Sequence, residues 1–360
     1  MISLNQVTKE YPGKIAVDEL TFEVEDGEFC VIIGPSGCGK STTLRMINRL
    51  IPVSGGSITL DGKDIYNYRP EELRRQIGYA IQSVGLFPHM TVARNIGIVP
   101  QLMNWDMSKI KRRTDELLDL LNLDPGVYRD QYPRQLSGGE AQRVGVARAL
   151  AADPAILLMD EPFGAIDPIT RESLQTEFAR IQKDLKKTIV LVTHDIDEAI
   201  RLATRILVLK DGKLVQHDTP ENIMTTPAGR FVTEFIGTDR ALKRLSRLPA
   251  GNYMKEAPNV MESDPLQSAA GLIAEHRYLW VLDRDGKVLG WLDENSLKSG
   301  EQTAGLAMTS LDFRMSAVDT DSTLKEALSR MVQQGIRSAP VVDMKGVLLG
   351  EIRMGDILDA

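Results

Sequence analysis

The stretch "EFCVIIGPSGCGKSTTLRMINRL" at positions 28 to 50 begins as an apolar run and continues into a pattern typical of a helix. We expect a buried strand from Glu28 to Ile33, a glycine-rich loop, and a helix from about Lys40. The loop fits the phosphate-loop pattern, in which backbone N–H groups surround phosphates. In that pattern Lys40 reaches the terminal phosphates and the Ser41 hydroxyl binds Mg²⁺. The sequence therefore predicts an ATP and magnesium site where this strand ends.

The length and composition of the chain predict a globular protein with more than one domain. It has 360 residues, of which 42% are apolar and 26% charged, and a single core rarely serves so long a chain. No window reaches the eighteen or so unbroken apolar residues of a membrane helix. The first residues, "MISLNQVTKEYPG", lack the apolar centre of a signal peptide, and two cysteines cannot form a disulfide framework. We therefore expect a cytoplasmic protein.

The distribution of charge argues against nucleic acid as a partner. Residues 1–249 contain 32 Lys and Arg against 33 Asp and Glu, and residues 250–360 contain 11 against 17. Neither part has the basic excess that nucleic-acid binding requires.

A second apolar run, "PAILLMDEP" at 154 to 162, ends in two acids. A buried parallel strand of this kind would deliver Asp160 to the edge of the sheet, where it could hold Mg²⁺ through water. Glu161 beside it could polarise the attacking water. Together with the phosphate loop, these acids predict ATP hydrolysis.

The segment "LSGGE" at 136 to 140, followed by "AQRVGVARAL", resembles the signature sequence of ATP-binding-cassette (ABC) proteins. Ser137 is a natural helix N-cap, and the Gly138 and Gly139 amides would point at an anion. In the family, that anion is the γ-phosphate held by a second, facing cassette, so the resemblance implies a homodimer. Glu140 departs from the family, which more often has Gln there, and this would weaken the phosphate contact slightly.

The same resemblance assigns the remaining site residues. Tyr11 in "KEYPGKIAV" matches the aromatic that stacks on adenine, Gln82 the glutamine that senses Mg²⁺ and water, and His194 in "TIVLVTHDIDEA" the switch histidine. The expected catalytic residues are Lys40, Gln82, Glu161 and His194, and the expected metal ligands are Ser41, Gln82 and Asp160. The expected nucleotide-binding residues are Tyr11, Gly34, Pro35, Ser36, Gly37, Cys38, Gly39, Lys40, Ser41, Thr42, Ser137, Gly138, Gly139 and Asp167, the last in "FGAID" at the dimer interface.

The stretch "SVGLFPHMTVARNI" at 83 to 96 resembles that of import systems, in which a groove receives a helix of the permease. The chain as a whole resembles the ATPase subunits of osmoprotectant importers for glycine betaine, choline or carnitine. That resemblance implies permease subunits as partners, a solute-binding protein as an indirect one, and a peripheral position on the inner face of the membrane. The alternative is a non-transport cassette protein, although such proteins usually carry two cassettes or long coiled coils. Which solute is carried does not follow from this chain.

The C-terminal third contains an internal repeat. Before it, "LVLKDGKLVQHD" predicts a hairpin with an Asp211-Gly212 turn, and "GRFVTEFIGTDRALKRL" at 229 to 245 a helical run. "VLDRDGKVLG" at 281 to 290 returns as "VVDMKGVLLG" at 341 to 350. Each copy predicts a short strand, a helix, two strands joined by a turn, and a closing helix, and the copies differ by two residues in the loop between helix and strand.

This repeat resembles a tandem CBS (Bateman) module. The expected fold is α/β throughout, with an ABC-type phosphate-loop domain at 1–240, a linker at 241–253, and CBS domains at 254–308 and 309–360. The resemblance implies a nucleotide site that uses Ser or Thr and, three residues later, Asp. The second copy has Arg353 and Asp356, and the first has Asp293 and Ser296. These departures argue against a mononucleotide in the first copy and leave one open in the second, near residues 335–342.

Three roles for the module stay open: binding a nucleotide, including a cyclic dinucleotide between subunits; sensing ionic strength through protein contacts; or holding the dimer together. The acidic excess of the C-terminal third argues against simple adsorption to an anionic membrane.

Overall fold

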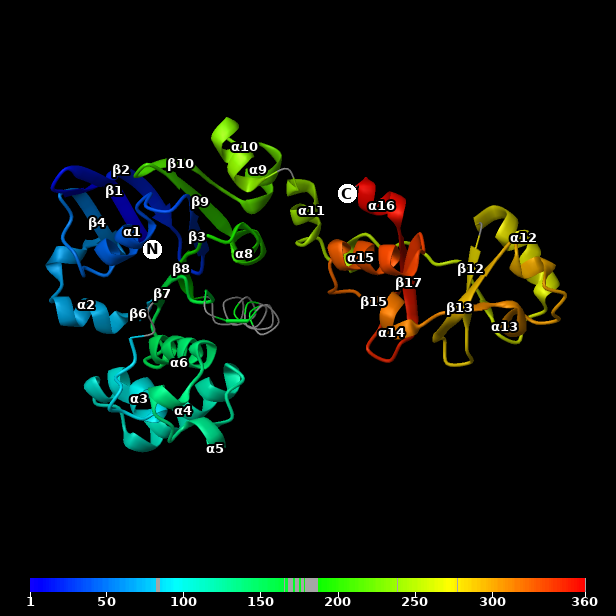
Figure 1. Ribbon diagram of the computed structural model, residues 1–360, viewed down its shortest axis with the longest axis horizontal. Helices are drawn as coiled ribbons and strands as arrows, with labels where there is room; N and C mark the ends of the chain where they lie inside the picture. Colours follow the sequence, from blue (N-terminus) through cyan, green and yellow to red (C-terminus); the bar gives the residue numbers. More distant parts are fainter. Residues whose placement is uncertain are drawn as a thin grey trace. The chain divides into compact units, whose positions relative to one another are not determined.

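The computed structural model describes residues 1–81, 85–164, 166–167, 171, 175, 178, 187–237, 239–276 and 278–359, without the side chains of residues 313 and 314. The chain divides into two units, Met1–Thr238 and Asp239–Ala360, whose elements are labelled in Figure 1. No helix in the described ranges is long and apolar enough to cross a membrane.

The first unit is organised around a six-stranded sheet. Its order is β10 (Lys213–Asp218), β9 (Arg205–Lys210), β3 (Phe29–Ile33), β8 (Thr188–Val192), β7 (Ile156–Asp160) and β6 (Ile77–Ala80). All neighbours pair in parallel except β10, which runs antiparallel to β9. The carboxyl ends of β3, β7 and β8 therefore meet at one edge of the sheet, as the sequence predicted for the strands after Glu28 and Pro154.

Both faces of this sheet are buried, which explains its uninterrupted apolar sequences. Along β3 the side chains alternate between two cores, with Phe29, Val31 and Ile33 in one cluster and Cys30 and Ile32 in the other. The first cluster includes residues of one group of helices, and the second joins the helix residues Leu44, Met46 and Ile47 to a smaller antiparallel sheet. That sheet has the order β2 (Lys14–Val24), β1 (Ile2–Tyr11), β4 (Gly55–Leu60), β5 (Lys63–Asp64).

The turn between β9 and β10 is the predicted Asp211-Gly212 hairpin, with positive φ values of 49° and 81° at the two residues. Positive φ at both central positions is the geometry that a two-residue hairpin favours.

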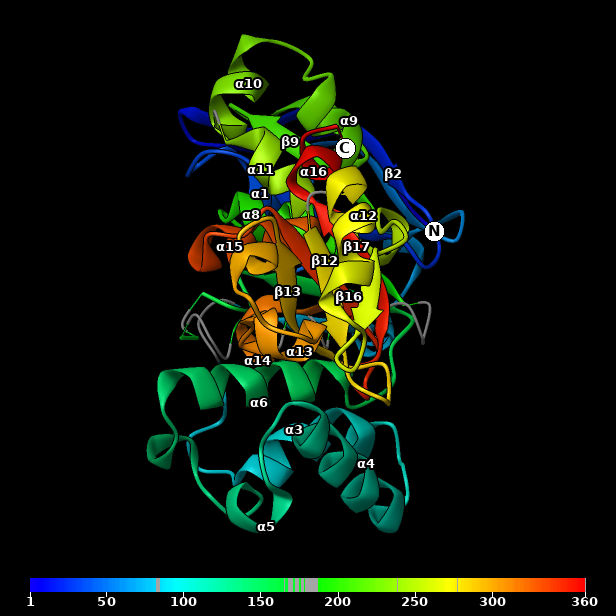
Figure 2. The same ribbon diagram turned by 90° about the vertical axis from the view of Figure 1, so that its right-hand side faces the viewer.

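The helices of the first unit are α1 (Lys40–Ile47), α2 (Pro70–Gln76), α3 (Val92–Leu102), α4 (Met107–Leu120), α5 (Pro125–Tyr128), α6 (Gly138–Leu150), α8 (Ile196–Leu202), α9 (Pro220–Thr225) and α10 (Arg230–Ile236), with 3₁₀ turns at Ile65–Asn67 and Pro133–Gln135. Helices α3, α4 and α6 pack together at one end of this unit (Figures 1 and 2). The helical run expected over 229–245 is two helices, α10 and α11 (Arg240–Leu245), because Gly237 ends the first with a φ of 99°.

The second unit contains the two predicted copies. The first comprises β11 (Asn259–Met261), α12 (Leu266–His276), β12 (Tyr278–Leu282), β13 (Val288–Asp293), a 3₁₀ turn at Ser296–Lys298, α13 (Ala304–Ala307) and β14 (Thr309–Ser310). The second comprises α14 (Phe313–Ser316), β15 (Val318–Asp319), α15 (Leu324–Gln334), β16 (Ser338–Val342), β17 (Leu348–Arg353) and α16 (Met354–Leu358).

The repeat is structural as well as sequential. In each copy the first strand runs parallel to the second, which pairs antiparallel with the third. One residue separates α12 from β12, and three separate α15 from β16, so the two-residue difference falls in the predicted loop. In the second copy α16 follows β17 directly, whereas in the first copy a 3₁₀ turn follows β13 and the short helix α13 comes after it.

Each copy has its own apolar core, and a third cluster joins them through Trp280, Leu282 and Val342 among others. The segment predicted as a linker, 241–253, contains most of α11 and a 3₁₀ turn at Ala250–Asn252. It contributes Leu245 and Ala250 to the core of the second copy.

Candidate nucleotide-binding site

The glycine-rich loop leaves the carboxyl end of β3 and enters α1 at Lys40. Gly39 has a φ of 103°, and a Cβ there would lie 2.5 Å from the carbonyl oxygen of Ala16. Only glycine fits this approach of two backbones. The buried Lys40 ammonium donates hydrogen bonds to the carbonyls of Gly34 at 2.7 Å and Pro35 at 3.0 Å. The loop therefore surrounds the Lys40 ammonium at the N-terminus of α1, and this arrangement is suited to binding phosphate.

The two predicted oxygen ligands of magnesium are in contact. The Ser41 hydroxyl donates a 2.8 Å hydrogen bond to Oδ1 of Asp160, the last residue of β7. Burial raises the pKa of the Asp160 carboxyl, while the Ser41 hydrogen bond opposes that rise. A hydroxyl and a buried carboxylate at this distance form a donor pair that suits a hard divalent cation.

Glu161 and His194 come from adjacent strand ends. Glu161 has a φ of 48°, a left-handed conformation uncommon outside glycine. Its backbone is fixed from both sides, because its N–H donates to the Val192 carbonyl at 2.9 Å and its carbonyl accepts from Nε2 of Gln142 at 2.8 Å. The Glu161 carboxylate lies 3.3 Å from Nδ1 of His194, measured from Oε1.

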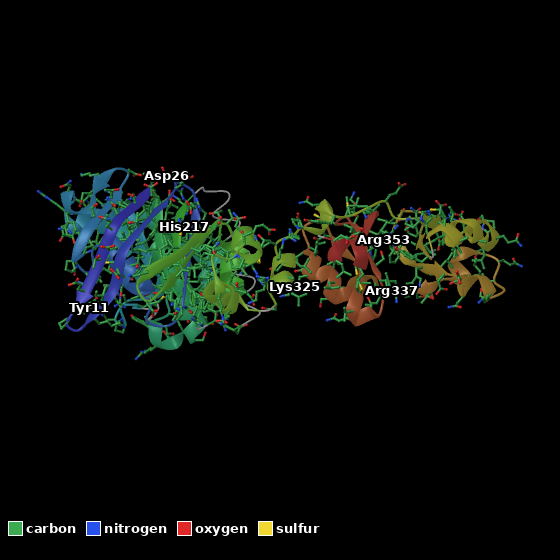
Figure 3. All side chains as sticks on the ribbon, turned by 90° about the horizontal axis from the view of Figure 1, so that it is seen from above. Tyr11, Asp26, His217, Lys325, Arg337 and Arg353 are labelled. Carbon is green, nitrogen blue, oxygen red and sulfur yellow. The ribbon has the colours of Figure 1, made fainter. Side chains whose placement is uncertain are left out.

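Lys40, Ser41, Glu161 and His194 line one cavity of about 630 Å³, and Asp160 lies outside its lining, hydrogen-bonded to Ser41. Tyr11, 44% exposed, lies on its rim at the end of β1 (Figure 3), with the Lys9 ammonium 5.0 Å from the centre of the ring. Sequence reasoning missed Lys14 and Ala16, although Lys14 follows Tyr11 closely in the same hairpin. The lining is Tyr11, Lys14, Ala16, Ser36, Gly37, Gly39, Lys40, Ser41, Thr42, Glu161 and His194.

Some of the expected nucleotide-binding residues lie outside this lining. Gly34, Pro35 and Cys38 belong to the loop but do not line the cavity, and Ser137, Gly138 and Gly139 lie at the start of α6. Ser137 is the N-cap, as predicted, and its hydroxyl accepts from the Glu140 N–H at 3.3 Å. The Glu140 carboxylate turns back to accept from the Ser137 N–H at 2.7 Å and the Tyr128 hydroxyl at 2.7 Å. The Tyr128 hydrogen bond is the main cause of the lowered pKa of Glu140. The departure from Gln is therefore accommodated as a capping box.

Two expected site residues remain. Gln82 lies outside the described residues. Asp167 also lies outside the cavity lining, and its carbonyl accepts a 2.8 Å hydrogen bond from the N–H of Arg171.

Behind the site lies a buried acid that sequence reasoning did not single out. The Thr193 hydroxyl, next to His194, donates a hydrogen bond to the Glu198 carboxylate and accepts one from the N–H of Asp195 at 3.0 Å. Burial raises the pKa of Glu198 to about 7. The signal in the sequence was an acid four residues after the histidine in "THDIDEA".

In the second unit the expected ribose ligands already have protein partners. Asp293 accepts from the N–H groups of Asn295 and Ser296 at 2.9 and 3.0 Å. Asp356 accepts from the Arg353 N–H at 3.1 Å and pairs with the ammonium of Lys255.

The most buried charge in the second unit is Glu351, which is fully shielded from solvent. Its Oε2 accepts from the Tyr278 hydroxyl at 2.6 Å, the Trp280 indole at 2.8 Å and the Ser338 hydroxyl at 3.0 Å. Its Oε1 accepts from Nε of Arg353 at 2.6 Å. Two of these donors belong to the first copy and two to the second.

Comparisons with known proteins identify the family of the chain. The profile of the ABC transporter family matches residues 17–164, and that of the CBS domain matches residues 250–299 and 312–360. The chain is 45% identical to the glycine betaine/carnitine/choline transport ATP-binding protein OpuCA of Bacillus subtilis, over 100% of this chain and 96% of that one. It is 44% identical to the osmoprotectant import ATP-binding protein OsmV of Salmonella typhimurium, over 100% and 96% of the two chains.

Among solved structures, a dimeric bacterial ABC transporter cassette superposes with a TM-score of 0.58 at 35% identity, covering 61% of this chain and 99% of that one. The same cassette in a post-hydrolysis state bound to ADP and Pi gives a TM-score of 0.57 at 34% identity, covering the same shares. These relatives favour the transporter ATPase over the non-transport cassette protein that the sequence left open. The chain is an ABC-type ATPase, and it belongs to the family of ABC transporter ATP-binding proteins that carry a C-terminal pair of CBS domains.

Proposed function

We propose that the chain hydrolyses ATP to drive an importer of osmoprotectants such as glycine betaine, carnitine or choline. The observation that carries the ATPase part is the shared cavity, which the Lys40 loop, Ser41 and the Glu161–His194 pair line, with Asp160 hydrogen-bonded to Ser41. The solute class is supported by relatives of 44 and 45% identity that match along the whole chain.

The residues at the edge of the sheet fit Mg²⁺. Ser41 and Asp160 supply a hydroxyl and a carboxylate 2.8 Å apart, and Gln82 completes the proposed ligand set. The bound ion would neutralise charge on the β- and γ-phosphates.

Each remaining residue has a distinct proposed role. Tyr11 stacks on the adenine, and Lys40 and the loop N–H groups bind the phosphates. Glu161 polarises the attacking water as the base, and His194 holds the Glu161 carboxylate in place and contacts the γ-phosphate. The rigid backbone of Glu161, fixed by Val192 and Gln142, keeps the carboxylate preorganised.

We propose a homodimer in which Ser137, Gly138 and Gly139 of one copy face the nucleotide of the other, with Asp167 at the interface. The N–H groups of Gly138 and Gly139 and the positive dipole end of α6 would face that nucleotide. Loss of the γ-phosphate removes the charge that bridges the two cassettes, which lets them separate. The dimer would sit on permease subunits at the inner face of the membrane, with a solute-binding protein delivering the solute to the permease.

The test is uptake by cells that lack their own osmoprotectant transporters, supplied with this chain and the permease and binding protein that co-purify with it from the native host. We expect saturable uptake of radiolabelled glycine betaine, carnitine or choline that is lost with Lys40→Ala. Uptake of a different solute class with the same Lys40 dependence would overturn the solute assignment while leaving the ATPase role intact. Uptake unaffected by Lys40→Ala would overturn the ATPase role.

We further propose that the CBS pair regulates the ATPase. Nucleotide sensing, ionic-strength sensing and dimer stabilisation stay open as the means. Deletion of residues 253–360 distinguishes a sensor from a scaffold. If the module is a sensor, the truncated protein should transport actively but no longer respond to osmotic conditions. If the module is a scaffold, the truncated protein should be a monomer. A thermal-shift screen of the full chain against nucleotides, including cyclic dinucleotides, then distinguishes the two kinds of sensor.

A further inference from the structure

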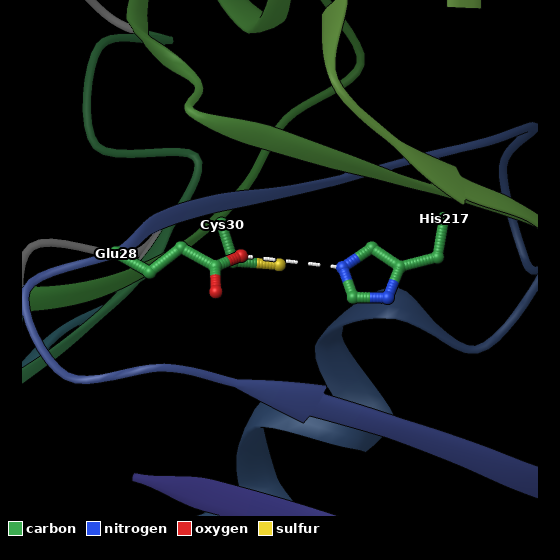
Figure 4. Close-up of side chains that lie close together, drawn as sticks. All are labelled: Glu28, Cys30 and His217. Carbon is green, nitrogen blue, oxygen red and sulfur yellow. Dashed lines mark ion pairs between the residues drawn. The ribbon is translucent and has the colours of Figure 1, made fainter. Parts of the chain in front are cut away.

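Glu28, Cys30 and His217 converge at the start of β3, the end opposite the phosphate loop (Figure 4). The strand register brings them together. Cys30 pairs with Arg205 of β9, and two residues along β9 Leu207 pairs with His217 of β10. Paired residues and residues two apart point to the same face of a sheet, so Cys30 and His217 share the face that lies toward the smaller sheet.

The three side chains present donor atoms to one another. One carboxylate oxygen of Glu28, the Cys30 sulfur and a ring nitrogen of His217 all lie within 4.8 Å of each other. Oε1 of Glu28 is 4.0 Å from Nε2 of His217. Oε2 of Glu28 accepts a 2.8 Å hydrogen bond from the Glu25 N–H, which turns Oε1 toward the cluster.

Two of these donors have no hydrogen bond within the described structure, although both are buried: Oε1 of Glu28 and Nε2 of His217. Glu28 is only 8% exposed. A buried polar atom without a partner is costly, and its presence in a well-packed core calls for an explanation. Two such atoms aimed at the same sulfur indicate a ligand that all three side chains share.

We propose that Glu28, Cys30 and His217 bind one zinc ion. Thiolate, imidazole and carboxylate together form a donor set that zinc prefers, whereas Mg²⁺ and Ca²⁺ prefer oxygen donors alone. In a tetrahedral zinc site neighbouring donors are about 3.5 Å apart, so the cluster closes by about 1 Å around the ion. Water would complete the coordination.

The charges around the cluster are compatible with this ion. Burial lowers the pKa of His217 to about 4, so the imidazole is neutral near pH 7 and free to ligate. Burial also raises the pKa of the Cys30 thiol, so zinc must displace its proton. The guanidinium of Arg205, which donates to the His217 carbonyl at 3.4 Å, opposes a cation. The thiolate and the Glu28 carboxylate together balance the two charges of zinc.

The proposed ion would connect strands that are not neighbours. Glu28 and Cys30 belong to the central strand β3 and its approach, His217 belongs to the edge strand β10, and β9 lies between them. Zinc would therefore fasten the edge of the sheet to its centre and stabilise the cassette without touching the ATP site.

The experiment uses the full chain, stripped with a chelator and dialysed against zinc, with bound metal measured by mass spectrometry. We expect one zinc per chain, and affinity at least about 100-fold weaker in His217→Gln and in Cys30→Val. His276→Gln, Cys38→Ala and His194→Gln serve as matched controls that should retain the zinc, the last because His194 belongs to the ATP site. Zinc should also raise the melting temperature of the wild type by about 5 °C but not that of His217→Gln.

Cobalt gives a readout that does not depend on how the variants fold. The wild type loaded with Co²⁺ should show thiolate-to-cobalt charge-transfer absorption, since Cys30 supplies the sulfur. Absence of that absorption, or zinc retained at full affinity by both folded variants, would overturn the proposal. Loss of zinc only in His194→Gln would place the metal at the ATP site instead and overturn it equally.

Discussion

The imidazole of His194 and the carboxylate of Glu161 face each other across the ends of β8 and β7, with 3.3 Å between Nδ1 and Oε1. Their exposures differ sharply, since the side chain of His194 is 67% exposed and that of Glu161 20%. The acid is thus held by the protein while the histidine stays accessible to a nucleotide. This relationship underlies the first prediction.

Glu161→Gln should leave ATP binding intact and reduce turnover at least about 100-fold, because the amide keeps the shape of the acid but cannot accept the proton of the attacking water. Steady-state ATPase rates and nucleotide titration measure the two effects. Glu234→Gln, which changes an exposed acid paired with Arg230, is the matched control and should retain full activity. Near-normal hydrolysis by Glu161→Gln would show that another group does this work.

Glu140→Gln should tighten the ATP-dependent dimer about two- to fivefold. The substitution removes a negative charge from the N-terminus of α6, where the phosphate of the facing cassette would bind, and glutamine can still complete the capping box. Dimerisation can be followed by analytical ultracentrifugation in the Glu161→Gln background. Tyr128→Phe removes the hydrogen bond to Glu140 while keeping the charge, so it should give no gain, and an equal gain from both variants would contradict the electrostatic account.

The stability of the cassette should depend on pH through Glu198. Its pKa rises from the ordinary 4.5 to about 7 on folding, so between these values the folded state holds a proton that the unfolded state has lost. The contribution of Glu198 to the free energy of unfolding is most favourable below pH 4.5. It falls as the pH rises to about 7, by a total on the order of 3 kcal/mol. Urea unfolding at pH 5 to 8, followed by circular dichroism, should show this fall. Glu198→Gln should flatten it, and identical pH profiles for the two proteins would rule out the titration of Glu198.

Glu351→Ala should destabilise the C-terminal unit by about 3 kcal/mol, because it leaves the buried Trp280 indole and the half-buried Tyr278 hydroxyl without their acceptor and removes the partner of Arg353. Glu351→Gln should cost less, since its amide oxygen can still accept. Urea unfolding followed by circular dichroism measures both, and Glu294→Gln, at an exposed acid, is the control. An alanine variant as stable as the wild type would mean that water replaces the carboxylate.

The features that the sequence predicted correctly are those whose pattern lies within a short stretch of residues. The loop from Gly34 to Ser41, the acids at 160 and 161, and the doubled strand–turn–strand of the C-terminal third each lie within a short stretch, and the structure has strands, loops and helices at these places. The relatives confirm the family that these stretches indicated. The roles of the individual site residues remain proposals.

What the sequence did not reveal depends on distant residues meeting. His217 is nearly 190 positions from Cys30 in the sequence, and only the register through β9 brings them to one face. Glu351 lies in the middle of an otherwise ordinary strand, and the sequence around it gives no sign that its hydrogen-bond donors come from the other copy. The helical run expected over 229–245 is divided into two helices at Gly237, which takes a positive φ, and sequence periodicity does not show that break.

The chain enters the C-terminal unit in an unexpected order. Residues 245–255 precede the first copy in sequence, yet Leu248 and Ala250 exchange backbone hydrogen bonds with Leu324 and Ser322, and Lys255 pairs with Glu351 of β17. The segment that precedes the first copy is therefore part of the fold of the second copy, so the two copies are not consecutive independent units. A premature stop codon after the first copy would remove the surface on which residues 245–255 pack. The second copy is therefore needed for the segment that leads into the first.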